Sequence, residues 1–423
     1  MPERYGQRPS QVPRKGGGPP TPRPNRHWEE RVSRARLTGV IALAAAASLA
    51  LGACAARDQG SSSGTNTGSA AAPSQAADAA NPAGDGKAVC SGVSLAYAGT
   101  INGASAALGQ NILRGADLAV KQHNKANPNC QVTLKQFDTE GKPDKAPGIV
   151  TQVIAEADII GVVGLPFSGE SKAAGNLFNQ AGLVSISPSA TNPGLANNGW
   201  KTFFRGMGND AVQGPAAAKF LTDTLKAGKV CVVEDDSDYG MGLAGQVTQA
   251  LGAKATCSDK VKTGQTDFSA VVNKISSAGV DAIFYAGYYP EAGPFAQQLN
   301  DKGVTAKFVG PDGVKDNEFI KGAGSASANA YFTCPCVPED NFKDFTAAFK
   351  QIEGADPGTY SPEGYDVTTV MLKGIDSGIK DRAGLLNFVK NYNGQGLTKK
   401  FHWNDKGELS DTPVWSYKVD NGK

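Results

Sequence analysis

The chain has 423 residues, of which 40% are hydrophobic and 19% charged, and its formal net charge is +2. The first 53 residues hold eight Arg and one Lys against three Glu, so the rest of the chain carries a net charge of −4. A mildly acidic body without a basic stripe argues against nucleic acid as a partner.

The N-terminal segment has the pattern of an export signal. An apolar run from Leu37 to Leu51 is too short to span a bilayer as a helix but is typical of a secretory signal. It ends in Leu51-Gly52-Ala53-Cys54, which resembles the bacterial lipobox, whose cysteine is acylated and becomes the mature N-terminus. We therefore expect residues 1–53 to be a lipoprotein signal peptide and Cys54 to carry a lipid. The alternatives are a plain signal peptide with an incidental Cys54 and an uncleaved anchor helix, which the short apolar run disfavours.

Residues 54–89 consist largely of Ala, Ser, Gly, Asn, Thr and Pro, with few large apolar side chains. Such a segment cannot bury enough surface to offset the entropy lost on ordering. We therefore predict a disordered tether between the lipid and the globular remainder of the chain.

From residue 90 onward, strand and helix patterns alternate. A first series of strands is expected at Val93–Thr100, Gln131–Phe137, Ile159–Leu165 and Leu183–Ser187. The helices between them are expected around the apolar stripe Leu108, Ile112, Ala116 and Ala119, at Ala146–Glu156, and after Ser168 as the N-cap.

A second series repeats this alternation. Its strands are expected at Lys229–Glu234, Lys254–Lys260, Ala282–Ala286 and Lys307–Val309. Its helices are expected at Asp210–Leu225, Met241–Leu251, Phe268–Ala278 and Ala292–Asp301. Alternating strands and helices predict parallel sheets covered on both faces, and their number favours two doubly wound lobes over one sheet.

An even number of cysteines outside the cytosol suggests disulfides. The six that follow Cys54 are Cys90, Cys130, Cys231, Cys257, Cys334 and Cys336. Because the first four belong to pairs of strands that would be neighbours in a parallel sheet, we predict the bridges Cys90–Cys130 and Cys231–Cys257. The segment Cys334-Pro335-Cys336 is either a tight bridge or a pair of thiols.

Ligands of doubly wound folds bind outside the carboxyl ends of the strands. The loops there carry hydroxyls, glycines, tyrosines and carboxylates, and they are Thr100–Ala104, Pro166–Gly169, Pro188–Thr191, Asp235–Tyr239, Gly287–Glu291 and Pro311–Gly313. None of these loops holds a histidine, a GxSxG elbow, a P-loop or an HExxH motif. We therefore expect a protein that is not an enzyme and needs no metal or cofactor.

Six motifs follow one another in register between Val93 and Gly422. They are Ile186–Pro193, Gln213–Ala217, Asp238–Gly240, Tyr285–Glu291, Gly310–Val314 and Trp403–Gly407. Together they resemble the periplasmic leucine/isoleucine/valine-binding proteins of ABC importers. The resemblance implies the type I periplasmic binding protein fold, an α/β fold of two doubly wound parallel-sheet lobes joined by three hinge crossings.

The resemblance also implies where the lobes begin and end. The crossings would lie near Asn209-Asp210, Cys334–Cys336 and His402-Trp403. The first lobe would then contain residues 90–209 and 335–402, and the second lobe residues 210–334 and 403–423.

The resemblance further implies a binding site for an amino acid, whose carboxylate and ammonium groups both need partners. The matching positions for the carboxylate are Ser168, Ser189, Ala190 and Thr191. Those for the ammonium are Asp312 and Tyr288, while Tyr239 closes over the ligand and Leu108 lies beside its side chain. Asp312 stands where the family usually has Glu, and Leu108 where it often has an aromatic. Such a change in an apolar pocket is worth only about 1–3 kcal/mol per methylene, so the side chain of the ligand stays open.

The resemblance thus implies a substrate-binding component of an ABC importer, anchored by lipid to the outer face of the membrane. Its expected partners are an amino acid, branched-chain or aliphatic, and the permease subunits, and we expect a monomer that works by hinge closure. The alternative is a ligand-binding sensor lipoprotein for amino acids, amides or urea-like compounds.

Overall fold

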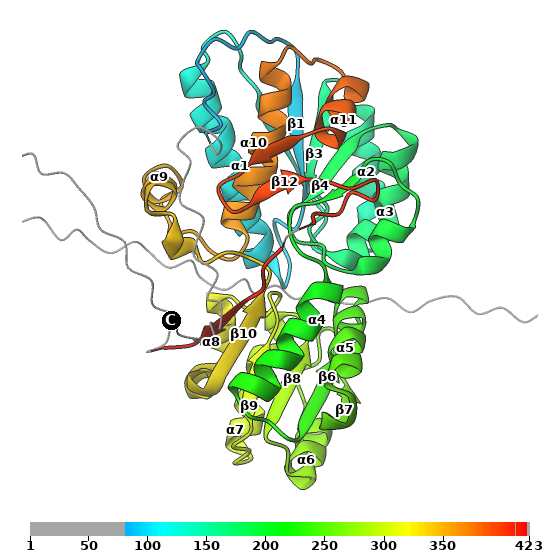
Figure 1. Ribbon diagram of the computed structural model, residues 1–423, viewed down its shortest axis with the longest axis vertical. Helices are drawn as coiled ribbons and strands as arrows, with labels where there is room; N and C mark the ends of the chain where they lie inside the picture. Colours follow the sequence, from blue (N-terminus) through cyan, green and yellow to red (C-terminus); the bar gives the residue numbers. More distant parts are fainter. Residues whose placement is uncertain (1–80, 411, 421–423) are drawn as a thin grey trace, which may run out of the picture. The chain divides into compact units, whose positions relative to one another are not determined.

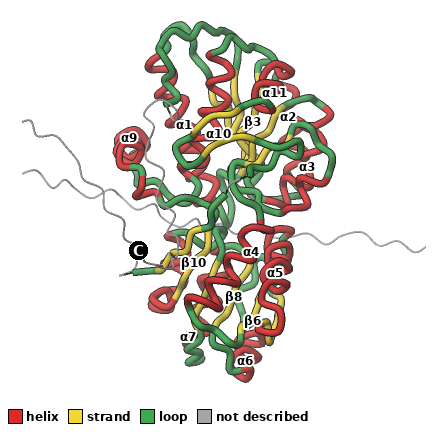
Figure 2. Tube along the Cα trace, viewed as in Figure 1, coloured by secondary structure: helices red, strands yellow, loops and turns green. Residues whose placement is uncertain are grey.

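The computed structural model describes residues 81–410 and 412–420, which form the two α/β lobes in the upper and lower halves of Figure 1. Each lobe is built on one sheet, with helices on both faces (Figure 2). A small antiparallel pair is added to the first lobe by β11 (Asn393–Gln395) and β12 (Lys400–His402). The predicted α/β fold class with two parallel-sheet lobes is confirmed.

The sheet of the first lobe has five parallel strands in the order β2-β1-β3-β4-β5. They are β1 (Ser94–Gly99), β2 (Thr133–Asp138), β3 (Ile159–Gly164), β4 (Val184–Ser187) and β5 (Phe203–Arg205). Successive residues of β1 face opposite sides, with Leu95 and Tyr97 in one apolar cluster and Ala96 and Ala98 in another. The sheet is therefore buried on both faces, as continuous apolar strands require.

Helices cover the two faces of this sheet in separate groups. They are α1 (Ala106–Ala126), α2 (Ala146–Ala155), α3 (Ser168–Gln180), α9 (Lys343–Glu353), α10 (Ser361–Asp376) and α11 (Arg382–Lys390). Helices α2 and α3 pack on one face, and α1, α10 and α11 on the other. The predicted stripe of α1, from Leu108 to Ala119, is completely buried against α10 and the sheet.

The sheet of the second lobe has six strands in the order β13-β10-β9-β8-β6-β7. They are β6 (Val230–Glu234), β7 (Ala255–Lys260), β8 (Ala282–Ala286), β9 (Lys307–Gly310), β10 (Ala330–Cys334) and β13 (Trp415–Lys418). Only β13, the last strand of the chain, runs antiparallel to its neighbour among them. The C-terminal segment thus closes one edge of this sheet.

The helices of the second lobe also form two groups. They are α4 (Asp210–Lys219), α5 (Asp238–Leu251), α6 (Ser269–Ala278), α7 (Tyr289–Asp301) and α8 (Asn317–Ala323). The first two share one apolar cluster, and residues of the other three share another. Short helical turns are η1 (Pro193–Asn197), η2 (Phe220–Thr224), η3 (Gly252–Lys254), η4 (Gly324–Asn329) and η5 (Glu339–Asn341). The helix expected at Asp210–Leu225 is therefore α only to Lys219 and continues as the π-helical turn η2.

The chain passes three times between the lobes. It crosses between β5 and α4, and again between β10 and α9, near the first two expected positions. The third crossing lies later than His402-Trp403. Trp403 Nε1 donates to the oxygen of Arg205 in β5 (2.7 Å), and Glu408 binds the guanidinium of the same residue, so this stretch stays with the first lobe. The chain reaches the second sheet only in β13.

The structured body begins earlier than expected. The predicted tether extended to residue 89, but Ala88 is buried and its N–H donates to Oδ1 of Asn127 at the end of α1 (3.1 Å). Asn127 in turn donates to the oxygen of Ala83 (2.9 Å). The predicted signal peptide and the lipidation site Cys54 lie outside the described residues. Among the residues that are described, no helix combines the length and the apolar character needed to cross a membrane.

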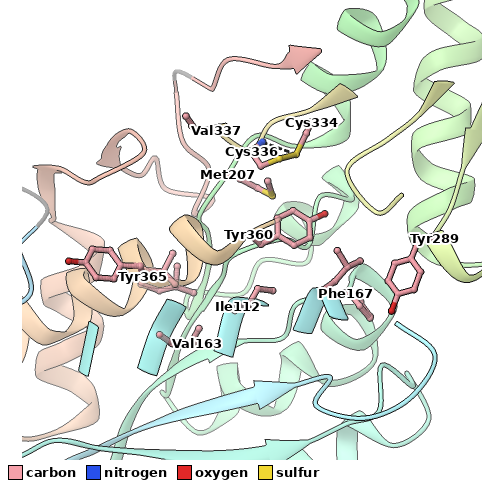
Figure 3. Packing of buried hydrophobic residues seen from close by; sticks show 14 of the residues in the cluster. Ile112, Val163, Phe167, Met207, Tyr289, Cys334, Cys336, Val337, Tyr360 and Tyr365 are labelled. Carbon is pink, nitrogen blue, oxygen red and sulfur yellow. Dashed lines mark hydrogen bonds between the residues drawn. A yellow bond between two sulfur atoms is a disulfide. The ribbon is translucent and has the colours of Figure 1, made fainter. Parts of the chain in front are cut away.

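Three disulfides join the cysteines between residues 81 and 410. Cys90–Cys130 and Cys231–Cys257, with Cα–Cα distances of 4.4 and 4.5 Å, are the two pairs that the sequence predicted. Cys231 and Cys257 face each other in the register of β6 and β7. Cys334 and Cys336, which the sequence left open, form the third bridge at the end of β10 (Figure 3).

The first bridge closes a loop between residues 40 positions apart, and a bridge stabilises mainly by restricting the unfolded chain. Replacing Cys90 and Cys130 together by Ala should therefore lower the free energy of unfolding by about 4 kcal/mol, as measured by urea denaturation. The matched control is the double Ala variant of Cys334 and Cys336, only two positions apart, which should lose much less. Equal losses in the two variants would contradict the prediction.

Candidate functional site

Apart from Leu108, which lies in α1, the ligand-binding residues predicted from the sequence follow the carboxyl ends of strands that meet between the lobes. In each lobe the strand order reverses at one point, between β1 and β3 in the first and between β6 and β8 in the second. Ser168 follows β3, Tyr239 follows β6 and Tyr288 follows β8. Ligands of doubly wound folds bind outside the strand ends at such a point. The topology thus brings both halves of the candidate site to the facing ends of the two sheets.

Ser168 is buried in the first turn of α3. Contrary to the prediction, it is not the N-cap of this helix, a position that Phe167 takes. The Phe167 N–H is instead satisfied by the Glu170 carboxylate at 3.1 Å. The Ser168 hydroxyl therefore does not cap the helix, and it accepts a hydrogen bond from the N–H of Asn192 (3.1 Å). This contact joins the two strand-end loops of the first lobe.

The loop after β4 carries Ser189, Ala190 and Thr191, which are all buried. The Ser189 hydroxyl donates to the oxygen of Pro166 (2.8 Å), and the Ala190 N–H donates to the hydroxyl of Ser187 (3.0 Å). The Thr191 hydroxyl makes no hydrogen bond within this loop. It lies against the buried Asp210 carboxyl, whose pKa it lowers, against the larger rise that burial causes.

Arg205 at the end of β5 holds this loop in place. Its completely buried guanidinium donates to the oxygens of Ala190 and Asn192, the latter at 3.0 Å. Glu408 supplies the countercharge through two hydrogen bonds of 3.0 and 2.9 Å. A buried cation with this many acceptors fixes the course of the loop backbone, so it also fixes where Thr191 lies.

Asp312 is the centre of the second-lobe half of the site. The residue follows β9, and its carboxylate is buried. Oδ1 accepts from Tyr239 Oη at 2.6 Å and from Gln213 Nε2 at 2.7 Å. Oδ2 accepts from Tyr360 Oη, also at 2.6 Å. Burial raises the pKa of the Asp312 carboxyl, and the hydrogen bonds from its three donors oppose that rise.

Tyr360 reaches Asp312 from the other lobe, because it directly precedes α10, which packs on α1. Its φ of 73° lies in the left-handed region, which a tyrosine rarely adopts and which often marks a functional position. Figure 3 shows its ring in the same buried cluster as Phe167 and Tyr289. The carboxylate of one lobe is therefore bound by a hydroxyl of the other.

The aromatic part of the site is a row of three rings. Tyr288 packs between Phe167 of the first lobe, at a centroid distance of 4.8 Å, and Tyr239 of the second, at 5.1 Å. The structure thus places Tyr288 in ring contacts between the lobes. Leu108 is completely buried in the first turn of α1, within the same large apolar cluster as Phe167.

Other contacts between the lobes surround the site. Tyr289 Oη donates to the oxygen of Ala104 at 2.8 Å, and Asn111 Nδ2 donates to Asp316 at 3.3 Å. On the other flank, Lys172 and Asp238 form an ion pair of 2.6 Å. These contacts belong to a closed arrangement, in which the site lies between the lobes and away from water.

Three residues of the site had no role in the prediction. Gln213 lay in a motif that was noticed only as a point of resemblance, although its place one turn into α4 could have suggested a side chain facing Asp312. No local sequence pattern indicates a role for Tyr360, because its orientation depends on an unusual φ and its partner Asp312 lies 48 residues away in the sequence. Phe167 stood inside a strand-end loop that was named as a whole.

His123, Cys130 and Asp376 come close enough to suggest metal binding, with ligand atoms within 4.8 Å of one another. Cys130, however, is bonded to Cys90 and has no thiolate to offer. The His123 Nε2 instead lies 2.7 Å from the Asp376 carboxylate. His123 and Asp376 therefore form a polar contact between α1 and α10.

Two α/β lobes with a buried, largely polar site at facing strand ends define a binding protein of the hinged type. Residues 92–423 match the family model described as periplasmic binding protein. The chain therefore belongs to this family, and its relatives mark it as a substrate-binding protein and not an enzyme, as the motifs predicted.

The similarity to known proteins extends over about three quarters of the chain. A leucine-, isoleucine-, valine-, threonine- and alanine-binding protein of Pseudomonas aeruginosa is 30% identical over 327 residues, 75% of this chain and 87% of that protein. The substrate-binding protein LivJ of Streptococcus pneumoniae, solved with isoleucine, has a TM-score of 0.74 at 27% identity and covers 78% of this chain and 97% of its own. The leucine-binding protein LivK of Thermotoga maritima has a TM-score of 0.70 at 25% identity, over 78% of this chain and 96% of its own.

The buried pair of Arg205 and Glu408 allows a direct test of what holds the Thr191 loop. Replacing Arg205 by Leu leaves the Glu408 carboxylate without its cation and frees the loop oxygens, so the free energy of unfolding should fall by about 3–5 kcal/mol. Urea denaturation measures this loss. The control is Lys321→Ala, which breaks an exposed ion pair with Glu318 and should cost less than about 1 kcal/mol. If both variants lose the same amount, Arg205 does not hold the loop.

Proposed function

We propose that this protein is the lipid-anchored, extracytoplasmic substrate-binding component of an ABC importer and that it binds an amino acid with an aliphatic side chain. The observation that carries the proposal is the buried Asp312 carboxylate, which three side chains orient at the boundary between the lobes. The names of the relatives, which bind leucine, isoleucine, valine and other amino acids, support the ligand class.

The polar groups of the site suit a zwitterion. Burying a carboxylate or an ammonium without partners costs several kcal/mol, so a closed site must offer both donors and a countercharge. In the proposal, the hydroxyls of Ser168 and Thr191 and the backbone N–H of Ser189 receive the carboxylate, and Ala190 lines the loop between them. The first turn of α3 adds a favourable dipole, because the N-terminus of a helix attracts anions. Asp312 receives the ammonium.

The apolar groups set the side-chain class. Tyr288, Phe167 and Tyr239 form an aromatic row across the site, and in our proposal Leu108 adds an aliphatic wall. Such a surface gains free energy by covering an aliphatic side chain at about 25 cal/mol per Å² of buried apolar area. A charged side chain placed against it would lose its hydration without gaining a partner.

Closure of the lobes would couple binding to transport. A ligand shifts an open–closed equilibrium only by the difference between its affinities for the two states. A ligand that contacts Thr191 of one lobe and Asp312 of the other has this difference, since an open arrangement separates the two groups. The closed form would then be recognised by the permease subunits, and the protein would act as a monomer without a cofactor.

Calorimetry with L-leucine, L-isoleucine and L-valine tests the ligand class and the role of Asp312 together. Asp312→Asn keeps the shape of the side chain but removes the charge that faces the ammonium. We expect the affinity of the best ligand to fall about 100-fold or more, equal to about 3 kcal/mol. Asp301→Ala, which removes an exposed acid at the end of α7, is the matched control and should bind as the wild type. Unchanged binding by Asp312→Asn would disprove this site assignment.

The proposed anchor depends on Cys54. Because its sulfur would carry the lipid, Cys54→Ser should move the protein from the membrane fraction into the soluble fraction of the producing bacterium and abolish labelling by radioactive palmitate. Ser62→Ala changes a hydroxyl in the same segment and should leave both unchanged. A Cys54→Ser protein that still sediments with membranes and still takes up palmitate would count against the anchor.

A further inference from the structure

The second crossing between the lobes contains the disulfide of Cys334 and Cys336, which only Pro335 separates in the sequence. Cys334 is the last residue of β10 and pairs with Trp415 of β13, so the bridge begins inside the sheet of the second lobe. Both cysteines are completely buried, and the Cys336 N–H donates to the Sγ of Cys334 (3.0 Å). Residues 334–336 therefore form a small closed ring at the point where the chain leaves this sheet.

This ring leaves the second crossing few bonds that can rotate. Each residue of an ordinary linker contributes two soft backbone torsions. Pro335 has a fixed φ, however, and the covalent link between the two sulfurs restricts the other torsions of the ring. The second crossing is therefore stiff from Cys334 to Cys336.

The peptide group between Cys336 and Val337 is held by both lobes at once. Its oxygen accepts a hydrogen bond from Tyr417 Oη at 2.8 Å, and its N–H donates to the Glu363 carboxylate at 3.2 Å. Tyr417 lies in β13 of the second lobe, whereas Glu363 lies in α10 of the first. Because a peptide group is planar, rotation along this crossing is confined to the torsions on either side of one rigid unit.

The other two crossings pass directly beside the ring. A Cβ added to Gly208, in the first crossing, would lie 3.2 Å from the Cβ of Pro335 and 2.9 Å from Oγ1 of Thr412 in the third crossing. Figure 3 shows Met207, the residue before Gly208, next to the two bridged cysteines. The three crossings thus pack against one another at the ring, which limits how far the first and the third can shift.

The ring is also joined to the candidate site. The oxygen of Thr333, the residue before the ring, accepts from Gln213 Nε2 at 2.9 Å. The same nitrogen donates to Asp312 Oδ1 at 2.7 Å. The point at which β10 ends therefore helps to determine where the Gln213 amide meets the Asp312 carboxylate.

We propose that the ring of residues 334–336 is a positioning element of the hinge, which restricts the opening of the unliganded lobes and so raises the affinity for the ligand. The inference rests on the proposed function for the ligand alone. Since the bridge is formed in the closed arrangement, its removal would free mainly the open one. The entropy lost when the backbone of one residue is fixed corresponds to about a tenfold change in an equilibrium constant. Without the ring, the fraction of protein that is ready to bind should fall by about this factor.

The test removes the ring from the crossing and leaves the other two bridges in place. We expect the double variant Cys334→Ala/Cys336→Ala to bind L-leucine about tenfold more weakly in calorimetry. Small-angle X-ray scattering should give it a larger radius of gyration than the wild type without ligand, and the same radius with saturating L-leucine. Cys90→Ala/Cys130→Ala, which loses the bridge near the end of α1, is the control. It should bind L-leucine as the wild type does, although it is expected to be the less stable of the two variants.

The outcomes distinguish this inference from the proposed function. An unchanged affinity of the Cys334→Ala/Cys336→Ala variant, or a radius of gyration equal to that of the wild type without ligand, would overturn the inference and leave the ligand class in place. If the wild type binds none of the three branched-chain amino acids, the proposed function falls, and the scattering of the unliganded proteins still decides about the hinge.

Should the double variant fail to fold, Tyr417→Phe takes its place, because it removes only the hydroxyl that holds the oxygen of Cys336. It should weaken the binding of L-leucine and enlarge the unliganded protein in the same direction. Wild-type values in both measurements would overturn the inference.

Discussion

The buried guanidinium of Arg205 is the constraint on which the rest of the site depends. One side chain joins the end of β5, the loop after β4 and, through Glu408, the last stretch of chain before β13. Its own backbone is held as well, with the N–H donating to Gly407 and the oxygen accepting from Trp403. Segments about 200 residues apart in sequence are thus held by one guanidinium, which also fixes the backbone of the strand-end loop in the candidate site.

A second buried ion pair holds the first two crossings between the lobes against the first lobe. Lys399 and Glu363 approach to 3.4 Å, and Lys399 also donates to the oxygen of Gly206, where the first crossing leaves β5. Glu363 accepts from the N–H of Val337, just after the bridged Cys334 and Cys336 in the second crossing. Because both crossings are pinned to the first lobe, any rotation between the lobes must be absorbed by the few residues beyond these points.

The elements could be predicted from the sequence because their causes are local. Continuous apolar runs such as Ile159–Leu165 can be buried only inside a covered sheet, and the stripe of α1 has a helical period. The contacts of Asp312 were less accessible, since Tyr360 lies in another lobe and in a rare backbone conformation. Asp210 was predicted only as a hinge position, because nothing in its neighbours along the chain indicates that its carboxylate is buried. Sequence periodicity does not show which polar groups of distant segments are buried beside one another in the folded protein.

The short segment 81–89 attaches the beginning of the described chain to the first lobe. Ala83 and Ala88 bind Asn127 at the end of α1, and the opposite end of this helix, near Ala106, faces the second lobe. The described chain therefore begins at the pole of the first lobe where α1 ends, away from the helix end that contacts the second lobe (Figure 1). If a tether ties this pole to a surface, the second lobe and the boundary between the lobes can turn relative to that surface without straining the attachment. The point of attachment would then be a pivot that leaves the binding face free to meet its partner in any orientation.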